Sequence, residues 1–193
     1  MNTDELLRQY DNGARDFMLA NLSDACLTER CLAAINLSKS HLGNANLSGS
    51  NLQRANLSAA ILTRATLWRS NLTSASLMSA NLNEANFIRA TLTNIDGNGA
   101  SLCKTDLRLA NLRGANLSQV NLMGADLRYA DLTGVNLTGA NLSRANFTGA
   151  NLAQADLRGA ILNCTIFGNT DLSSVSLIDV DLSHVDLRYA ILK

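Results

Sequence analysis

A leucine or phenylalanine recurs at every fifth position along almost the whole chain. From Phe17 to Leu192 there are 36 such centres without one shift of phase, and Gly97 is the single exception. An α-helix turns by about 100° per residue, so residues five apart would not share one face. A straight strand alternates its faces with a period of two, so an odd spacing would send successive leucines to opposite sides. The period therefore excludes an ordinary amphipathic helix and a flat sheet.

The residues around each centre repeat as well. Two positions before the centre, 21 of the 36 residues are Ala, and one position before it Asn or Asp is favoured. The two positions after it hold Ser, Thr, Gly, Arg and Gln, which are typical of exposed sites. A chain that bends equally in each repeat would point every centre at a common axis and stack its loops as a solenoid. The sequence thus predicts leucine and small side chains inside and the other three positions outside.

The run ANLSRANFTGANLAQADLRGA, which begins at Ala140, displays this pattern in the form A(D/N)LXX. It resembles the pentapeptide-repeat family, in particular its short cyanobacterial members, over residues 15 to 193. The resemblance implies an all-β fold, a right-handed quadrilateral parallel β-helix in which four pentapeptides complete one coil of twenty residues. The repeats then make about nine coils in a single repeat domain, residues 15–193.

The first fourteen residues do not follow the repeat. They predict a short capping α-helix, which we expect to cover the open hydrophobic end of the first coil, since an exposed strand edge invites aggregation. A partner-binding helix is the alternative. The signals are an N-cap, acidic residues in the first turn, two apolar residues on one face and a glycine stop: Thr3, Asp4, Glu5, Leu6, Tyr10 and Gly13.

The opposite end of the repeats has no comparable cap and is rich in branched apolar residues. We expect two copies to stack end to end there as a two-fold homodimer, with a monomer as the alternative. The residues of this candidate dimer end are Val175, Val180, Leu182, Val185, Leu187, Ile191 and Leu192.

Gly97 is the one missing centre. If the coil continued normally, the lost leucine would leave a gap, unless a neighbour such as Phe87 filled it. The pairs Asp96-Gly97 and Asn98-Gly99 favour positive φ instead. We therefore expect a local distortion of structural origin over residues 94–99, with a functional switch as the alternative.

Residues twenty apart stack on one side of such a coil, so outward residues can be sorted by side. The side centred on Leu67, Phe87 and Leu107 mixes aromatic, aliphatic and arginine side chains, as interface hot spots do. A solvated wall is the alternative, because Arg residues that follow an Asp by two would be neutralised within their own strand. The predicted interaction face, called the Trp68 strip below, consists of Trp68, Arg69, Ile88, Arg89, Arg108, Leu109, Arg128, Tyr129, Arg188 and Tyr189.

Catalytic signals are sparse. Cys164 and His184 are one coil apart, with Arg144 one coil earlier, and a thiol beside an imidazole can be a nucleophile pair. A flat outer wall would offer it no cavity. The four cysteines lack metal-site spacing, and the chain has neither a glycine-rich phosphate loop nor a dinucleotide fingerprint. We expect no catalytic, cofactor-binding or metal site.

The formal net charge is zero. Residues 30–95 hold six basic residues against one acid, but these are dispersed over several sides, so we do not expect direct nucleic-acid binding. Asp4 and Glu5 stand where a secretory signal would need positive charge, and no run of about 18 apolar residues occurs. We expect a cytoplasmic protein that is not inserted in a membrane.

These features favour a non-enzymatic protein-interaction scaffold, for which regulation is one use. The family resemblance implies an alternative, a DNA mimic that binds gyrase or another topoisomerase. The chain is neutral and has no inserted loop, which favours the scaffold. A second alternative is an enzyme that uses the surface pair Cys164 and His184.

Overall fold

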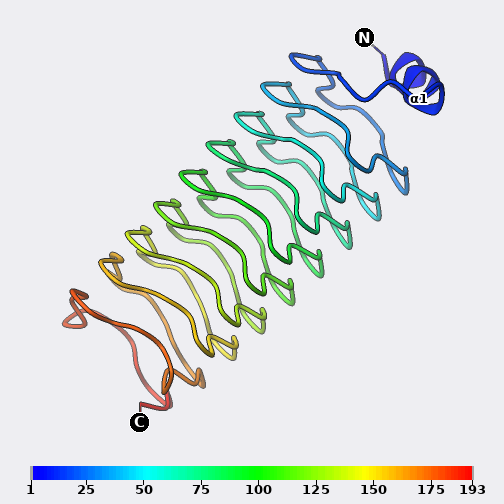
Figure 1. The fold of residues 1–193 in the computed structure, drawn as a ribbon. Coiled ribbons are helices and arrows are strands. Elements are labelled where there is room, and N and C mark those ends of the chain that lie inside the picture. Colours follow the sequence, from blue (N-terminus) through cyan, green and yellow to red (C-terminus); the bar gives the residue numbers. More distant parts are fainter. Residues whose placement is uncertain (1, 193) are drawn as a thin grey trace.

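The computed structural model describes residues 2–192 as a straight stack of coils with one short helix, α1 (Thr3–Asp11), at its first end (Figure 1). The two chain ends lie at opposite ends of the stack. The described coils contain single bridge residues, five positions apart, in place of longer strands. The protein therefore has the β-helix type of fold that the repeat predicts, with the helix as an addition at its N-terminus.

Every bridge is parallel and joins residues twenty positions apart, for example Asn46 to Thr66 and Thr66 to Asn86. The N–H of most repeat centres donates to a carbonyl of the following coil, as Leu47 does to Thr66 at 2.7 Å. Since bridges recur every five residues, four of them complete one coil. The twenty-residue coil that the family resemblance implied is thus confirmed.

A tight turn follows each centre and bends the chain. The N–H three residues after the centre donates back to its carbonyl, as Ala130 does to Leu127 at 3.1 Å. The third residue of this turn has positive φ, about 60° at Leu109 and Tyr129, which is the feature of type II turns. The turn therefore forces even bulky side chains into the left-handed region and directs them outward.

The core is a column of repeat centres with small side chains beside them. Nearly all centres from Leu22 to Phe167 are almost fully buried. The rings of Phe147 and Phe167 stack at 5.1 Å between centroids. Where Ser or Thr replaces Ala, the hydroxyl is satisfied, as when Ser50 Oγ donates to the Leu47 carbonyl at 2.6 Å. The predicted inside and outside positions are thereby confirmed.

The expected distortion over residues 94–99, at Asp96, Gly97, Asn98 and Gly99, is not present. The Gly97 N–H donates to the Asn116 carbonyl at 2.8 Å, as a leucine at this position would. Only Asn94 and Gly99 have positive φ there, at the positions where every turn requires it. The expectation was wrong because Leu117 of the next coil and Ile95 lean into the gap; a Cβ on Gly97 would lie 2.9 Å from Leu117 Cδ2.

Helix α1 packs against the first coil. Leu6 and Tyr10 are buried, and the Tyr10 hydroxyl donates to the Ala33 carbonyl at 2.8 Å. The N-cap is Asn2 rather than the predicted Thr3: the Asn2 side-chain oxygen accepts from the Glu5 N–H at 2.8 Å. Asn2 is extended and Thr3 is already helical, so only Asn2 can supply this cap.

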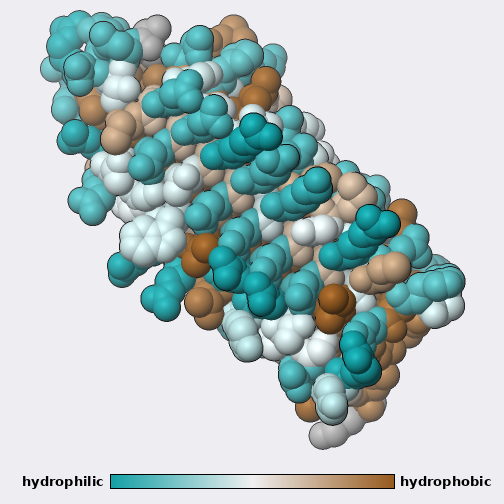
Figure 2. All heavy atoms as spheres, turned by 180° about the vertical axis from the view of Figure 1, so that it is seen from behind, coloured by the Kyte–Doolittle hydropathy of each residue, from teal (hydrophilic) through white to brown (hydrophobic). Residues whose placement is uncertain are grey.

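The last coil is more exposed than those before it. The apolar residues of the candidate dimer end are half-buried or exposed, up to 55% for Leu192. Figure 2 shows apolar side chains, in brown, gathered at the C-terminal end of the stack, whereas the wall that it shows is mainly polar. The chain thus covers its first end with α1, and residues 2–192 provide no such cover for the other end.

Candidate interaction face

Parallel bridges place four successive coils side by side under the Trp68 strip. Thr66 pairs with Asn86, Asn86 with Asp106, and Asp106 with Asp126. These bridge residues each lie two or three positions before an outward residue of the strip. The structure therefore brings eight predicted residues together, namely Trp68, Arg69, Ile88, Arg89, Arg108, Leu109, Arg128 and Tyr129.

The other two predicted residues, Arg188 and Tyr189, lie on the same side but apart from the eight. Two coils, centred on Phe147 and Phe167, separate them from Tyr129. Those coils present small or polar residues on this side: Thr148, Gly149, Gly168 and Asn169. The strip is therefore one continuous group of eight residues and a separate pair near the C-terminal end.

Large apolar side chains of the continuous group are open to solvent. Trp68 is 42% exposed, Leu109 48% and Tyr129 63%. Ile88, Leu109 and Tyr129, together with Arg108 and Arg128, line an open depression of about 310 Å³. An exposed aromatic and aliphatic group of this kind is typical of surfaces that bind other proteins.

The position of the Tyr129 ring depends on a glycine that the sequence did not single out. Gly149, one coil further on, has no side chain to oppose the ring, and a Cβ there would lie 2.6 Å from Tyr129 Cε1. Gly149 and Tyr129 are twenty residues apart, so the coil period itself contains the signal. Glu29 and Gly49, which line a second depression with Trp68 and Arg69, were missed in the same way.

Three arginines of the strip are paired within their own Asp-Leu-Arg segment, as predicted. Arg108 Nη2 lies 2.6 Å from Asp106 Oδ2, and Arg128 and Arg188 make the same contact with Asp126 and Asp186. The backbone N–H of each arginine donates to the same carboxylate at 3.1–3.2 Å. These guanidinium groups are therefore neutralised where they stand.

The pairing changes the acidity of the carboxylates. Burial raises the pKa of the Asp126 carboxyl, but hydrogen bonds from the side chain and N–H of Arg128 outweigh it, so the pKa lies below its ordinary value. The side-chain hydrogen bond from Arg188 lowers the pKa of Asp186 from 3.8 to about 2, and its N–H adds to the effect. Asp126 and Asp186 are thus ionised at neutral pH.

Arg69 and Arg89 differ from the other arginines of the strip. Neither forms an ion pair with a carboxylate within residues 2–192. The Arg69 guanidinium lies 5.1 Å from the centroid of the Trp68 ring, within the range of a cation–π contact. The first half of the strip therefore carries positive charge that its own chain does not neutralise.

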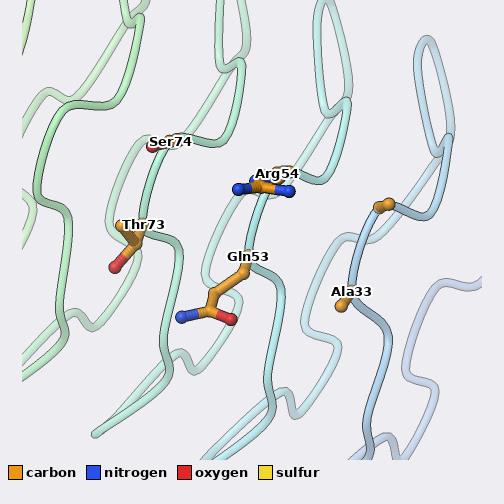
Figure 3. Close-up of a pocket in the computed structure, with 6 residues that line it drawn as sticks. Ala33, Gln53, Arg54, Thr73 and Ser74 are labelled. Atoms are coloured by element: carbon orange, nitrogen blue, oxygen red, sulfur yellow. The ribbon is translucent and has the colours of Figure 1, made fainter.

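The other sides of the stack have polar depressions. Figure 3 shows one of about 370 Å³, in which Gln53 and Arg54 project from the middle coil and Ala33, Thr73 and Ser74 lie on the coils beside it. Another is lined by Asn44, Thr63, Arg64, Asn83 and Glu84. Neither contains an exposed aromatic or large aliphatic side chain, so the apolar character distinguishes the Trp68 strip.

Cys164 and His184 lie on adjacent coils, as predicted. The Cys164 N–H donates to the His184 carbonyl at 2.9 Å. The His184 ring, however, makes its hydrogen bond through Nδ1 with Ser183 Oγ at 2.8 Å, and the Cys164 thiol is exposed. No side-chain hydrogen bond joins the two residues in the described structure, so the contact is one of backbone stacking.

The described part of the chain holds no group of three or more His, Cys, Asp or Glu side chains arranged to bind a metal ion. Its four cysteines are free thiols. Within residues 2–192 no helix has the length and apolar character that crossing a membrane requires.

Comparison with known structures gives several similar folds. One is HetL, a pentapeptide-repeat protein involved in heterocyst differentiation regulation from the cyanobacterium Nostoc sp. strain PCC 7120. It is 33% identical to this protein; the match covers all of this chain and 93% of the HetL chain, with a TM-score of 0.47. A trypsin-treated form of QnrB1, a plasmid-mediated fluoroquinolone resistance protein, is 20% identical, covering 93% and 92%, with a TM-score of 0.57. A pentapeptide-repeat protein from the cyanobacterium Cyanothece 51142 is 24% identical over 99% of both chains, with a TM-score of 0.35.

No curated protein matches this sequence. Two family profiles do match it. The profile described as "Pentapeptide repeats" matches residues 31–69, 125–163 and 165–193, and the one described as "Pentapeptide repeat region" matches 65–142. The matched segments cover most of the chain and agree with the observed twenty-residue coil, and on these grounds the protein belongs to the pentapeptide-repeat family.

Proposed function

We propose that this protein is a non-enzymatic scaffold, a right-handed rod of about nine coils that binds another protein through the Trp68 strip. The observation that supports this most is the exposure of Trp68, Leu109 and Tyr129 on one side of a hydrogen-bonded stack. Their backbone is bonded to the neighbouring coils, so the side chains are presented without the entropic cost of ordering a loop. Aromatic residues and arginine are also the residue types that interface hot spots favour.

The test is recovery of partners from the native cell with the wild-type protein and with a Trp68→Ala, Arg89→Ala double variant. We expect the variant to lose the main partner. A Met78→Ala, Met123→Ala variant is the matched control, because both methionines are about 40% exposed but lie on other sides. If the Trp68→Ala, Arg89→Ala variant recovers the same partners as wild type, the strip is not the binding face.

We also propose that two copies join end to end through the candidate dimer end defined above. The support is the exposure of branched apolar side chains on the last coil, among them Leu182 and Ile191. Light scattering at micromolar concentration is expected to give the mass of two chains. Ile191→Asp should reduce it to one chain; a single-chain mass for the wild-type protein would contradict the dimer.

A further inference from the structure

We propose that the continuous part of the Trp68 strip binds an acidic amphipathic α-helix of the partner, laid along the rod over the coils centred on Leu67, Phe87, Leu107 and Leu127. This inference rests on the proposed function, because it specifies the partner segment for the same face. Three features of the strip support it: the course of its apolar side chains, their spacing, and the position of its unpaired charges.

The apolar side chains form one row that crosses four coils. Trp68 and Ile88 occupy the first outward position after their centres, whereas Leu109 and Tyr129 occupy the second. The row therefore runs obliquely along the rod. Gly149 lets the Tyr129 ring lie over the following coil, and the ring borders the depression that Ile88 and Leu109 also line. An elongated apolar ligand would cover this row.

The spacing of the row fits a helix better than a strand. Neighbouring coils are roughly 4.8 Å apart, so the second, third and fourth side chains lie about 4.8, 9.6 and 14.4 Å along the axis from the first. Helix residues i+3, i+7 and i+10 lie about 4.5, 10.5 and 15 Å from residue i. Alternate residues of an extended strand would lie about 6.7 Å apart and lose register within two coils.

The charge of the strip selects an acidic helix. Arg69 and Arg89 flank the first half of the row and have no carboxylate partner within residues 2–192, whereas Asp106 and Asp126 neutralise Arg108 and Arg128 in the second half. The acidic residues of the helix should therefore lie over the coils centred on Leu67 and Phe87. Glu29 lines the depression beside Trp68 and Arg69, so the positively charged part of the strip ends there, toward the N-terminal end of the rod.

A nucleic acid fits this surface less well than an acidic helix. A phosphate backbone needs a series of free cations, and the strip offers two of them. Beyond Arg89 a phosphate backbone would meet the carboxylates of Asp106 and Asp126. Arg108 and Arg128 are already paired with these carboxylates and are not free to bind phosphates. The exposed apolar row would also stay uncovered by phosphates.

The experiment uses two fluorescent helical peptides of about 18 residues, each with Leu at i, i+3, i+7 and i+10. One carries Glu beside the first two leucines, and the other carries Lys at the same places. Fluorescence anisotropy is measured with the full chain at low and at raised salt. We expect the Glu peptide to bind, the Lys peptide not to bind, and added salt to weaken the complex.

Two variants with matched controls locate the binding. Arg69→Gln with Arg89→Gln should lower the affinity for the Glu peptide about five-fold. Arg54→Gln with Arg144→Gln removes the same charge from other sides of the rod and should leave this affinity unchanged. Gly149→Ala should weaken it by displacing the Tyr129 ring. Gly134→Ala is its control, because Gly134 has a similar φ of 67° and open space around it. Ala34 and Ala59 already adopt such a φ, so both variants should fold.

The proposal of an acidic helix is overturned if the two peptides bind equally well or if the arginine variant binds the Glu peptide with unchanged affinity. It is also overturned if duplex DNA displaces the Glu peptide as effectively as the unlabelled Glu peptide does. The partner recovery described under Proposed function separates the two proposals. If Trp68→Ala with Arg89→Ala loses the native partner while the Glu peptide does not bind, the scaffold proposal stands and the acidic helix is wrong.

Discussion

The Asp-Leu-Arg segments show how strongly a residue here depends on the one two positions away. In each segment the aspartate accepts a hydrogen bond from the arginine N–H and forms an ion pair with its guanidinium, as Asp126 does with Arg128. Both contacts lie within one pentapeptide and need no neighbouring coil. The same residue types therefore behave alike at Asp106, Asp156 and Asp186.

The first prediction concerns the acidity of Asp186. Carboxyl chemical shifts should titrate with a midpoint of about 2, and Arg188→Gln should move that midpoint up toward 3.8. Because the folded-state pKa is depressed, the pair stabilises the fold above the ordinary pKa and loses this contribution as pH falls through 2. A midpoint of 3.8 in the wild-type chain would show that the ion pair does not form in solution.

The second prediction concerns Gly97, where a leucine would restore the repeat. We expect Gly97→Leu to destabilise the protein by about 1–3 kcal/mol, because Leu117 and Ile95 already fill the space. Ile95→Ala in the same chain should recover part of the loss, since Ala is the usual residue at that position. Denaturant unfolding of the wild-type protein and the two variants measures this; a stabilising Gly97→Leu would mean that the gap is empty.

At the scale of elements, the two ends of the stack differ in how far their apolar side chains are covered. Helix α1 buries Leu6 and Tyr10 against the first coil, whereas the last coil leaves its apolar side chains partly exposed. Stacked repeats contact only their neighbours, so an end without a cap has unsatisfied apolar surface. This asymmetry is the physical reason for proposing the dimer at the C-terminal end alone.

The third prediction tests the cap of α1. Asn2→Ala should destabilise the helix by about 1 kcal/mol, because the Glu5 N–H loses its acceptor. Thr3→Ala should have little effect, since Thr3 lies inside the helix. Hydrogen exchange at the Glu5 amide reports the difference directly. Faster exchange in Thr3→Ala than in Asn2→Ala would restore Thr3 as the N-cap.

At the scale of the whole molecule, the rod is neutral and many of its carboxylates are paired. Within residues 2–192, six aspartates and glutamates outside α1 form ion pairs with arginines, among them Asp131 with Arg113 and Glu84 with Arg64. Duplex DNA presents a continuous array of negative charge. A rod whose acidic groups are matched in this way would imitate that array poorly.

The fourth prediction follows from this charge balance. The protein should leave gyrase supercoiling unchanged at tens of micromolar, because a neutral wall lacks the field that attracts a DNA-binding surface. A gyrase inhibitor of the same fold should be run beside it as a positive control. Inhibition by this chain would replace the scaffold with the DNA mimic as the leading function.

The sequence by itself determined the inside and outside of every repeat, because the five-residue period admits one regular arrangement of leucines. It also predicted the pairing of Arg108, Arg128 and Arg188, since these contacts lie within a pentapeptide. The position of the Trp68 strip followed only once the length of the coil was taken into account. The twenty-residue coil came from the family resemblance, because the period alone does not fix the number of sides.

Only the tertiary structure decided how the gap at Gly97 is filled, because Leu117 reaches it from a neighbouring coil. It also decided that the Tyr129 ring lies in the space that Gly149 leaves open. These features depend on side-chain conformation and on contact between coils. A repeat places backbones at fixed spacing, but the direction of each side chain follows from the space its neighbours leave.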